Sequence, residues 1–110
     1  MRLPRGGEAV IDERKVIDYL LSTTHAVGRH KARVFFSALG LAVEDAPIIV
    51  AALRSAAVTG DATLVGQDDY GMRYRIDFRM THSGKSGIVR SAWRVPPGES
   101  HAIFLTAFMI

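Results

Sequence analysis

The chain contains no cysteine among its 110 residues. This absence excludes a disulfide scaffold, a thiolate nucleophile and a cysteine-ligated zinc site. It also suits a reducing compartment, so we expect the domain to act in the cytoplasm. No run of about 20 apolar residues occurs, which excludes a transmembrane helix. Residues 1–7 lack the apolar core of a signal peptide, although export as part of a larger protein is compatible with the sequence.

Acidic residues are scarce between residues 72 and 95. This segment has one acid, Asp77, and six basic residues, a local charge of +5, whereas the rest of the chain has eight basic and ten acidic residues. The basic residues are Arg73, Arg75, Arg79, Lys85, Arg90 and Arg94. The arginines alternate with large apolar residues at the period of a β-strand, which predicts one arginine face and one apolar face. Because guanidinium groups bind phosphates and carboxylates, the arginine face is a candidate anion-binding surface.

The first half of the chain shows helical periodicity. Asp12 is a predicted N-cap for a helix over residues 12–22. A second helix is expected over residues 29–39, and a third over residues 44–58 with Asp45 as its cap. A glycine follows each of the last two helices and predicts its end.

The second half shows the two-residue period of strands. Four strands are expected, over residues 62–66, 72–80, 86–95 and 101–108, and their short connectors favour antiparallel neighbours. The sequence therefore predicts an α+β fold, with two to three helices packed on one face of a four-stranded antiparallel meander. We expect residues 1–110 to form a single domain, helical over about 12–58 and a sheet over about 62–108.

The turn between the two arginine-rich strands fixes a testable register. A two-residue turn at Ser83-Gly84 pairs Asp77 with Arg90 as a cross-strand ion pair, and Tyr74 with Trp93 in the core. The pair at Asp77 leaves the other arginines, Arg73, Arg75 and Arg94 in particular, freer than Arg90.

The last strand has a less certain register. If it pairs near Arg94–Ala102, then Thr106 lies beside Arg90, and Phe104 also joins the arginine face. A β-bulge would overturn this alignment.

The start of the second predicted helix carries three cations and a histidine: Arg29, His30, Lys31 and Arg33. Cations at a helix N-terminus oppose the macrodipole, whereas anions are attracted there. His30 beside Lys31 is a candidate for acid–base chemistry near neutral pH. The other histidines have no spacing that matches a metal site, so no metal ligand and no cofactor is predicted.

The basic face also has a purely structural explanation. On the solvated face of a sheet, arginine stems commonly cover apolar surface without binding any ligand. The excess of five arginines over one acid favours a binding function over this structural explanation.

The order of several short motifs resembles a family of small bacterial domains of unknown function. The motifs are Leu3-Pro4, residues 9–15 (AVIDERK), residues 28–36 (GRHKARVFF), residues 70–74 (YGMRY), residues 89–93 (VRSAW) and residues 105–107 (LTA). Such domains are found alone or at the ends of larger bacterial proteins, often beside a gene for a small partner. Their helices-then-meander layout is similar to that of the barnase–EndoU–colicin–RelE group of ribonuclease toxins.

The resemblance implies a ribonuclease of toxin type that needs no metal and is neutralised by an acidic cognate immunity or antitoxin protein. The implied catalytic residues are His30, Lys31, Arg90 and Thr106. The implied RNA-binding residues are Arg33, Arg73, Arg75 and Arg94. The family usually has a tyrosine where this chain has Phe108, an aromatic ring that can still stack on a base.

Two other functions stay open. The arginine face can belong to a non-catalytic module that binds an acidic protein or RNA, or the chain can be a small structural domain with no site. Catalysis in one site requires that the basic face and the helix start at His30-Lys31 meet.

Overall fold

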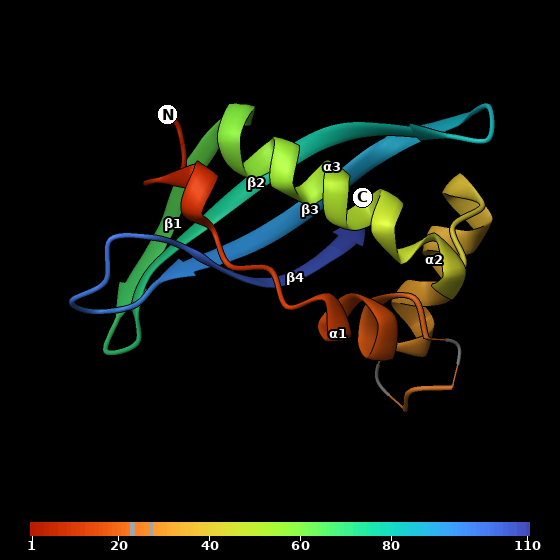
Figure 1. Cartoon of the computed structure of the whole chain (residues 1–110), viewed down its shortest axis with the longest axis horizontal. Helices are drawn as coiled ribbons and strands as arrows, with labels where there is room; N and C mark the ends of the chain where they lie inside the picture. Colours follow the sequence, from red (N-terminus) through yellow and green to blue (C-terminus); the bar gives the residue numbers. More distant parts are fainter. Residues whose placement is uncertain (23, 27) are drawn as a thin grey trace.

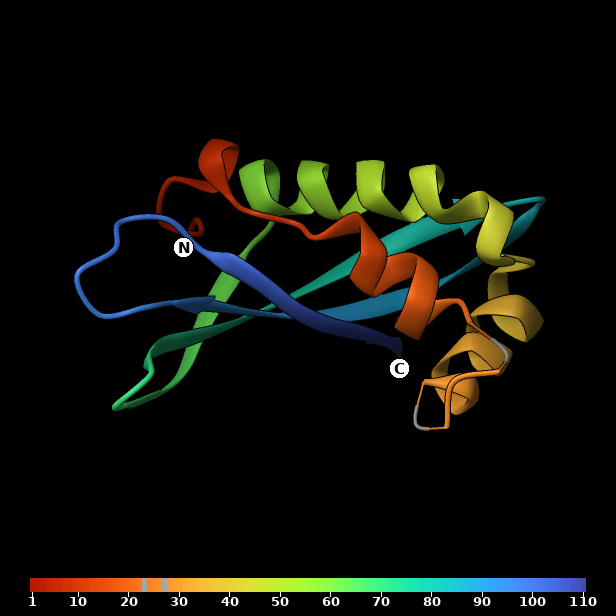
Figure 2. The same ribbon diagram turned by 60° about the horizontal axis from the view of Figure 1, so that its bottom comes forward.

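The computed structural model describes residues 1–22, 24–26 and 28–110. In chain order its elements are η1 (Gly6–Glu8), α1 (Glu13–Lys15), η2 (Val16–Leu20), α2 (Arg29–Leu39), η3 (Val43–Asp45), α3 (Ala46–Thr59), β1 (Ala62–Asp68), β2 (Gly71–His82), β3 (Lys85–Val95) and β4 (Ile103–Met109). The helices pack with an antiparallel sheet of strand order β1-β2-β3-β4, which confirms the predicted α+β meander. Helix α3 runs along one face of the sheet, and α2 lies at the end where β4 terminates (Figures 1 and 2).

The first predicted helix begins as expected and ends differently. The Asp12 carboxylate accepts a hydrogen bond from the backbone N–H of Arg14 at 3.0 Å, so Asp12 is the N-cap. The helix then widens into the π-helical turn η2, closed by the Leu21 N–H bonding to the Val16 carbonyl. This turn places Val16 and Leu21 on one side of the helix, and both are buried in the core.

Helix α2 has the bounds that the sequence predicted, and Gly40 follows it in the left-handed conformation at φ 68°. Helix α3 begins later than predicted, at Ala46, and Asp45 is its N-cap residue as predicted, although the Asp45 carboxylate caps the preceding 3-10 turn η3 instead of α3. Its carboxylate accepts a hydrogen bond from the backbone N–H of Ala42 at 2.9 Å. At the other end, a side chain at Gly60 would come within 2.6 Å of Ile76, so this glycine permits the close approach of α3 to β2.

The β2–β3 hairpin has the predicted register. Ser83 and Gly84 both have positive φ angles, 52° and 74°, which is the backbone of a type I′ turn. Asp77 pairs with Arg90, and Tyr74 pairs with Trp93. One face of the hairpin is therefore apolar and covered by α3, and the other carries the arginines.

The predicted register of β4 is wrong in two respects. Arg94 pairs with Ile103 instead of Ala102, a shift of one residue that turns Phe104 into the core opposite Trp93. A bulge at Leu105 then restores the alternation, so Thr106 lies on the arginine face but opposite Ala92, not beside Arg90. Phe108 takes the position opposite Arg90.

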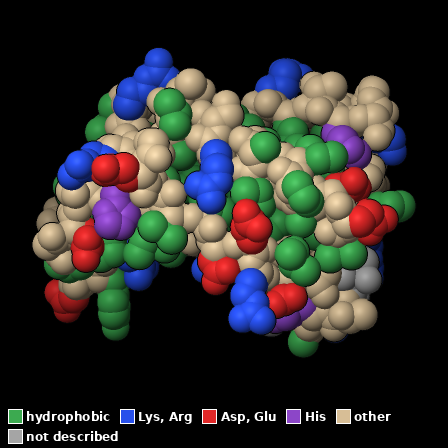
Figure 3. Space-filling model, in the orientation of Figure 1, with side chains coloured by type: hydrophobic (Ala, Val, Ile, Leu, Met, Phe, Trp, Pro, Cys, Tyr) green, Lys and Arg blue, Asp and Glu red, His purple; other side chains and the backbone are tan. Residues whose placement is uncertain are grey.

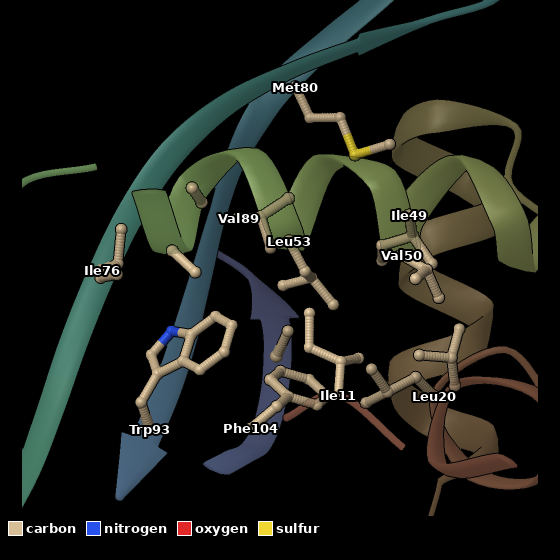
Figure 4. Close-up of a cluster of buried hydrophobic side chains, with 14 of the residues drawn as sticks. Ile11, Leu20, Ile49, Val50, Leu53, Ile76, Met80, Val89, Trp93 and Phe104 are labelled. Atoms are coloured by element: carbon tan, nitrogen blue, oxygen red, sulfur yellow. The ribbon is translucent and has the colours of Figure 1, made fainter. Parts of the chain in front are cut away.

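The core lies between α3 and the apolar face of the sheet (Figure 4). Trp93 and Phe104 pack edge to face, with ring centroids 5.3 Å apart. Ile11 lies beside Phe104, and Leu53 projects from α3 towards the sheet, whereas Ile49 lies further along α3 beside Val50 in the same core. Burial of the two aromatic rings at the centre fixes the position of β4 against β3.

A buried serine satisfies the polar group of Trp93. The Ser91 hydroxyl accepts a hydrogen bond from Trp93 Nε1 at 2.9 Å and donates one to the carbonyl of Ile76 at 2.8 Å. Ser91 is fully buried, and it is the one buried polar side chain among the residues that the structure describes. Its hydroxyl is therefore needed to satisfy the indole N–H in a dry core.

We expect Ser91→Ala to lower the free energy of unfolding by about 1–3 kcal/mol, because the buried indole N–H loses its acceptor. Urea unfolding followed by tryptophan fluorescence measures the change. Ser55→Ala, on the exposed side of α3, is the matched control and should leave stability nearly unchanged. Equal stability of the two variants would show that the hydroxyl is dispensable.

Candidate functional site

The sheet face opposite α3 carries the arginines in rows across the strands. Arg73 lies opposite Arg94; Arg75 lies opposite Ala92, which lies opposite Thr106; and Asp77 lies opposite Arg90, which lies opposite Phe108. Arg79 lies opposite Ile88 one row further along. We call this surface the basic face. By contrast, basic and acidic side chains are interspersed on the face that α3 covers (Figure 3).

Asp77 neutralises Arg90 on this face. The guanidinium donates from Nε and Nη2 to the two carboxylate oxygens, each at 2.9 Å. The hydrogen bonds from Arg90 hold the pKa of Asp77 below its ordinary value, and partial desolvation opposes them only in part. The same hydrogen bonds raise the pKa of Arg90. The Nε and Nη2 donors of Arg90 are thus already occupied by Asp77.

The other arginines of the basic face differ in their pairing. Arg73 has one contact with an acid, 3.7 Å from the carboxylate of Asp68, which is longer than either contact of Arg90 with Asp77, so Arg73 is freer than Arg90 as predicted. Arg79 donates a hydrogen bond to the hydroxyl of Ser86, at 3.4 Å. Within the described part of the chain, Arg75 and Arg94 form no ion pair, which confirms the prediction that they are freer than Arg90.

The start of α2 meets the basic face at Thr106. The Lys31 ammonium donates a hydrogen bond to the Thr106 hydroxyl at 2.9 Å. The same ammonium lies 5.2 Å from the ring centroid of Tyr19 and 5.6 Å from that of Phe108. Lys31 is half-buried and forms no ion pair with any described acid. Two rings and a hydroxyl thus hold a cation whose charge no carboxylate neutralises.

A cavity of about 360 Å³ adjoins this ammonium and is lined by His30, Lys31, Val34, Phe108 and Met109. His30 is exposed at its rim. The structure therefore brings together three predicted site residues, His30, Lys31 and Thr106. Access from solvent and mixed apolar and cationic walls suit an anionic ligand that carries an aromatic group.

Two predicted site residues lie apart from this centre. Arg33 is exposed on α2, two residues after Lys31. A helix rotates by about 200° over two residues, so Arg33 faces away from the Thr106 that Lys31 contacts. Arg90 is held by Asp77 one row away. Arg75 instead shares a cross-strand row with Thr106, and only the methyl group of Ala92 separates them.

Tyr19 is a site residue that the sequence did not predict. It precedes the buried Leu20, and nothing in its local sequence associates it with Lys31. Its backbone packs against Gly28, where a side chain would collide with the Tyr19 carbonyl. This close approach brings η2 against the start of α2, which a local motif cannot reveal.

Among residues 1–22, 24–26 and 28–110, His, Asp and Glu side chains form no group of three or more that could hold a metal ion. No single helix in the same described ranges has the length and apolar composition to cross a membrane. Taken together, the segments Arg29–Leu39 and Val43–Thr59 have that length and composition, but they are bent by 76° at their junction.

The chain belongs to a family described as a domain of unknown function (DUF6883), which matches residues 2–110. The family resemblance predicted from the sequence is therefore confirmed. No curated protein matches the chain. A chain in the solved structure of a contact-dependent growth inhibition toxin–immunity protein complex from Klebsiella pneumoniae 342 has a similar fold. The TM-score is 0.68 at 17% identity, over 94% of this chain and 95% of that chain.

The Asp77–Arg90 pair gives a pH-dependent contribution to stability. Because the pKa of Asp77 is lowered by folding, the pair stabilises the fold above the ordinary value of 3.8, and this contribution is lost as the pH falls through the folded pKa. We expect the difference in unfolding free energy between wild type and Asp77→Asn to be constant near neutral pH and to shrink below that value. Urea unfolding over a pH series measures the difference.

Asp69→Asn is the control for the change in net charge, since Asp69 is exposed and forms no ion pair with a described cation. A difference between wild type and Asp77→Asn that stays the same in acid would contradict the assignment.

Proposed function

We propose that this domain is a toxin module that cleaves RNA without a metal ion and is neutralised by a cognate partner protein. The observation that carries the proposal is the unneutralised ammonium of Lys31, held by Thr106 at the edge of the basic face. The fold shared with a chain of a growth inhibition toxin–immunity protein complex supports the toxin class. We infer that the module acts on RNA in the cytoplasm of the target cell.

The proposed reaction uses the 2′-hydroxyl of the RNA as the nucleophile. Its oxygen forms a bond to the adjacent phosphorus while the bond from phosphorus to the 5′-oxygen breaks, leaving a 2′,3′-cyclic phosphate. A base accepts the proton of the 2′-hydroxyl, and an acid protonates the departing 5′-oxygen. Charge accumulates on the phosphoryl oxygens in the transition state, where fixed cations stabilise it.

Lys31 is the proposed stabiliser of this charge. Tyr19 and Phe108 flank its ammonium, so it is oriented without being neutralised. The Thr106 hydroxyl fixes the ammonium and can also donate a hydrogen bond to a phosphoryl oxygen. Arg75 is the proposed second cation, because it is unpaired and lies in the same cross-strand row as Thr106.

His30 is the proposed general acid or base. It lines the same cavity as Lys31 and is exposed to a bound substrate. Arg73 and Arg94 would bind flanking phosphates, and Arg33 would contribute long-range attraction. Arg90, which the sequence suggested as catalytic, orients Asp77 and supplies no free charge in this proposal.

A second candidate function is supported by the unpaired arginines. Arg75 and Arg94 can bind the carboxylates of an acidic protein as well as phosphates, so the basic face is also the proposed docking surface for the neutralising partner. A partner seated there would cover the approach to Lys31. A non-catalytic module would use the same face for an acidic protein or RNA and leave His30 without a role.

We expect the purified domain to cleave total RNA in the presence of EDTA and to leave a cyclic phosphate. Lys31→Ala should reduce the rate roughly 100- to 1,000-fold, since the transition state loses a fixed cation. Thr106→Val should also reduce the rate, whereas Thr106→Ser keeps the hydroxyl and should retain most of it. Gel analysis of a labelled RNA measures the rates.

Lys15→Ala is the matched control, because Lys15 lies on α1 and its ammonium forms no ion pair with a described acid. RNA that stays intact would contradict the ribonuclease assignment. Cleavage by His30→Ala at the wild-type rate would remove His30 from the mechanism.

Expression in a bacterial host tests the toxin class independently. We expect wild-type domain to arrest growth, and co-expression of the neighbouring partner gene to restore it. Lys31→Ala should be tolerated without the partner, because the proposed charge stabilisation is lost. Growth that is unaffected by well-expressed wild-type domain would contradict the proposal.

A further inference from the structure

An exposed tyrosine stands at the end of the basic face, in the turn between β1 and β2. Tyr70 is 68% exposed, and the Arg94 guanidinium lies 5.4 Å from its ring centroid. The backbone N–H of Tyr70 donates to the Asp68 carboxylate at 2.8 Å. Gly71, at φ 118°, packs so tightly against the Val95 carbonyl that no other residue would fit. The backbone at Tyr70 is therefore constrained, and most of the ring surface is open.

Arg94 lacks partners that its position requires. Its Nε is buried without a hydrogen-bond acceptor among the described residues. It lies directly opposite Arg73, and like charges at opposed positions destabilise a sheet. Among the described residues, Asp68 is the acid that forms an ion pair with either arginine, with its carboxylate 3.7 Å from Arg73. An anion between the two guanidinium groups would relieve the repulsion between these opposed charges, whereas the buried Nε of Arg94 lies out of reach of a ligand from solvent.

We propose that Tyr70, Arg73 and Arg94 form a nucleotide subsite for single-stranded RNA. A phosphate binds between the two arginines, and the attached base stacks on the Tyr70 ring. Stacking on an aromatic ring accepts every base, so the subsite adds affinity with little sequence preference. This inference rests on the proposed function, since it supposes that RNA is the substrate.

The charges around the turn favour a base, not a second phosphate, at Tyr70. Asp68 and Asp69 precede the tyrosine, and their carboxylates repel phosphate groups. A neutral base avoids that repulsion and gains contact with the ring. An acidic side chain of a protein would satisfy Arg94 but would leave the ring unused.

The subsite lies next to the proposed scissile centre. Arg94 is two residues along β3 from Ala92, which corresponds to about 7 Å. Ala92 lies opposite Thr106, which holds Lys31. The subsite therefore takes a nucleotide close to the cleaved bond in the RNA strand.

Binding of a non-cleavable strand tests the subsite apart from catalysis. The probe is a fluorescent single-stranded DNA oligomer, which lacks the 2′-hydroxyl nucleophile, and its partner is an abasic oligomer of the same length. We expect Tyr70→Ala to weaken binding of the base-bearing oligomer roughly 5- to 150-fold, and to leave binding of the abasic oligomer unchanged. Tyr70→Phe should bind like wild type.

Two further variants complete the test: Arg94→Gln tests the phosphate contact, and Phe36→Ala is the control. Arg94→Gln should weaken binding of both oligomers and reduce the salt dependence by about one phosphate contact. Phe36→Ala removes another exposed aromatic ring, 60% exposed on α2, and should change neither affinity.

Equal affinities of Tyr70→Ala and wild type for the base-bearing oligomer would overturn the subsite, as would equal losses on both oligomers. If base-dependent binding is lost in Tyr70→Ala but wild type does not cleave RNA, the subsite stands and the ribonuclease assignment fails. If wild type cleaves RNA and Tyr70→Ala binds normally, the subsite alone fails.

Discussion

The two-residue turn at Ser83-Gly84 is the constraint on which the rest of the structure depends. Its positive φ angles fix the register of the longest hairpin, and a slip of one residue would turn the arginine-bearing face of one strand towards the core. In the observed register, Trp93 and Tyr74 face α3, while Asp77 meets Arg90 on the other side. The core and the basic face are thus two results of one turn, so changes that weaken the hairpin would affect stability and ligand binding together.

The bulge at Leu105 determines how the sheet contacts α2. Before the bulge, β4 places Phe104 in the core against Trp93; after it, Thr106 emerges on the basic face, where Lys31 reaches it. Without the extra residue, Thr106 would point into the core, and α2 would have no polar anchor on this surface. A local irregularity of one strand therefore connects the helical layer to the arginines.

Strong local signals made much of this arrangement predictable. The glycine after α2, the Asp12 cap and the type I′ turn each depend on adjacent residues, and each appears where the sequence placed it. The register of β4 could not be predicted, because the irregular connection between Val95 and Ile103 does not fix the pairing that follows. The contact of Lys31 with Tyr19 depends on a π-helical turn and on Gly28, features of the tertiary structure that have no local signature.

Pairing divides the cations of the basic face into two classes that the sequence could not distinguish. Arg90 and Arg73 have carboxylate partners, and a role in covering the sheet accounts for them. That role does not account for Lys31, which aromatic rings hold without an acid, or for Arg94, whose buried Nε lacks an acceptor. Arg94 and Arg75 lie in neighbouring rows of the sheet, and Lys31 of α2 reaches the row of Arg75 through Thr106. This clustering is the main support for the proposal that the face binds a polyanion.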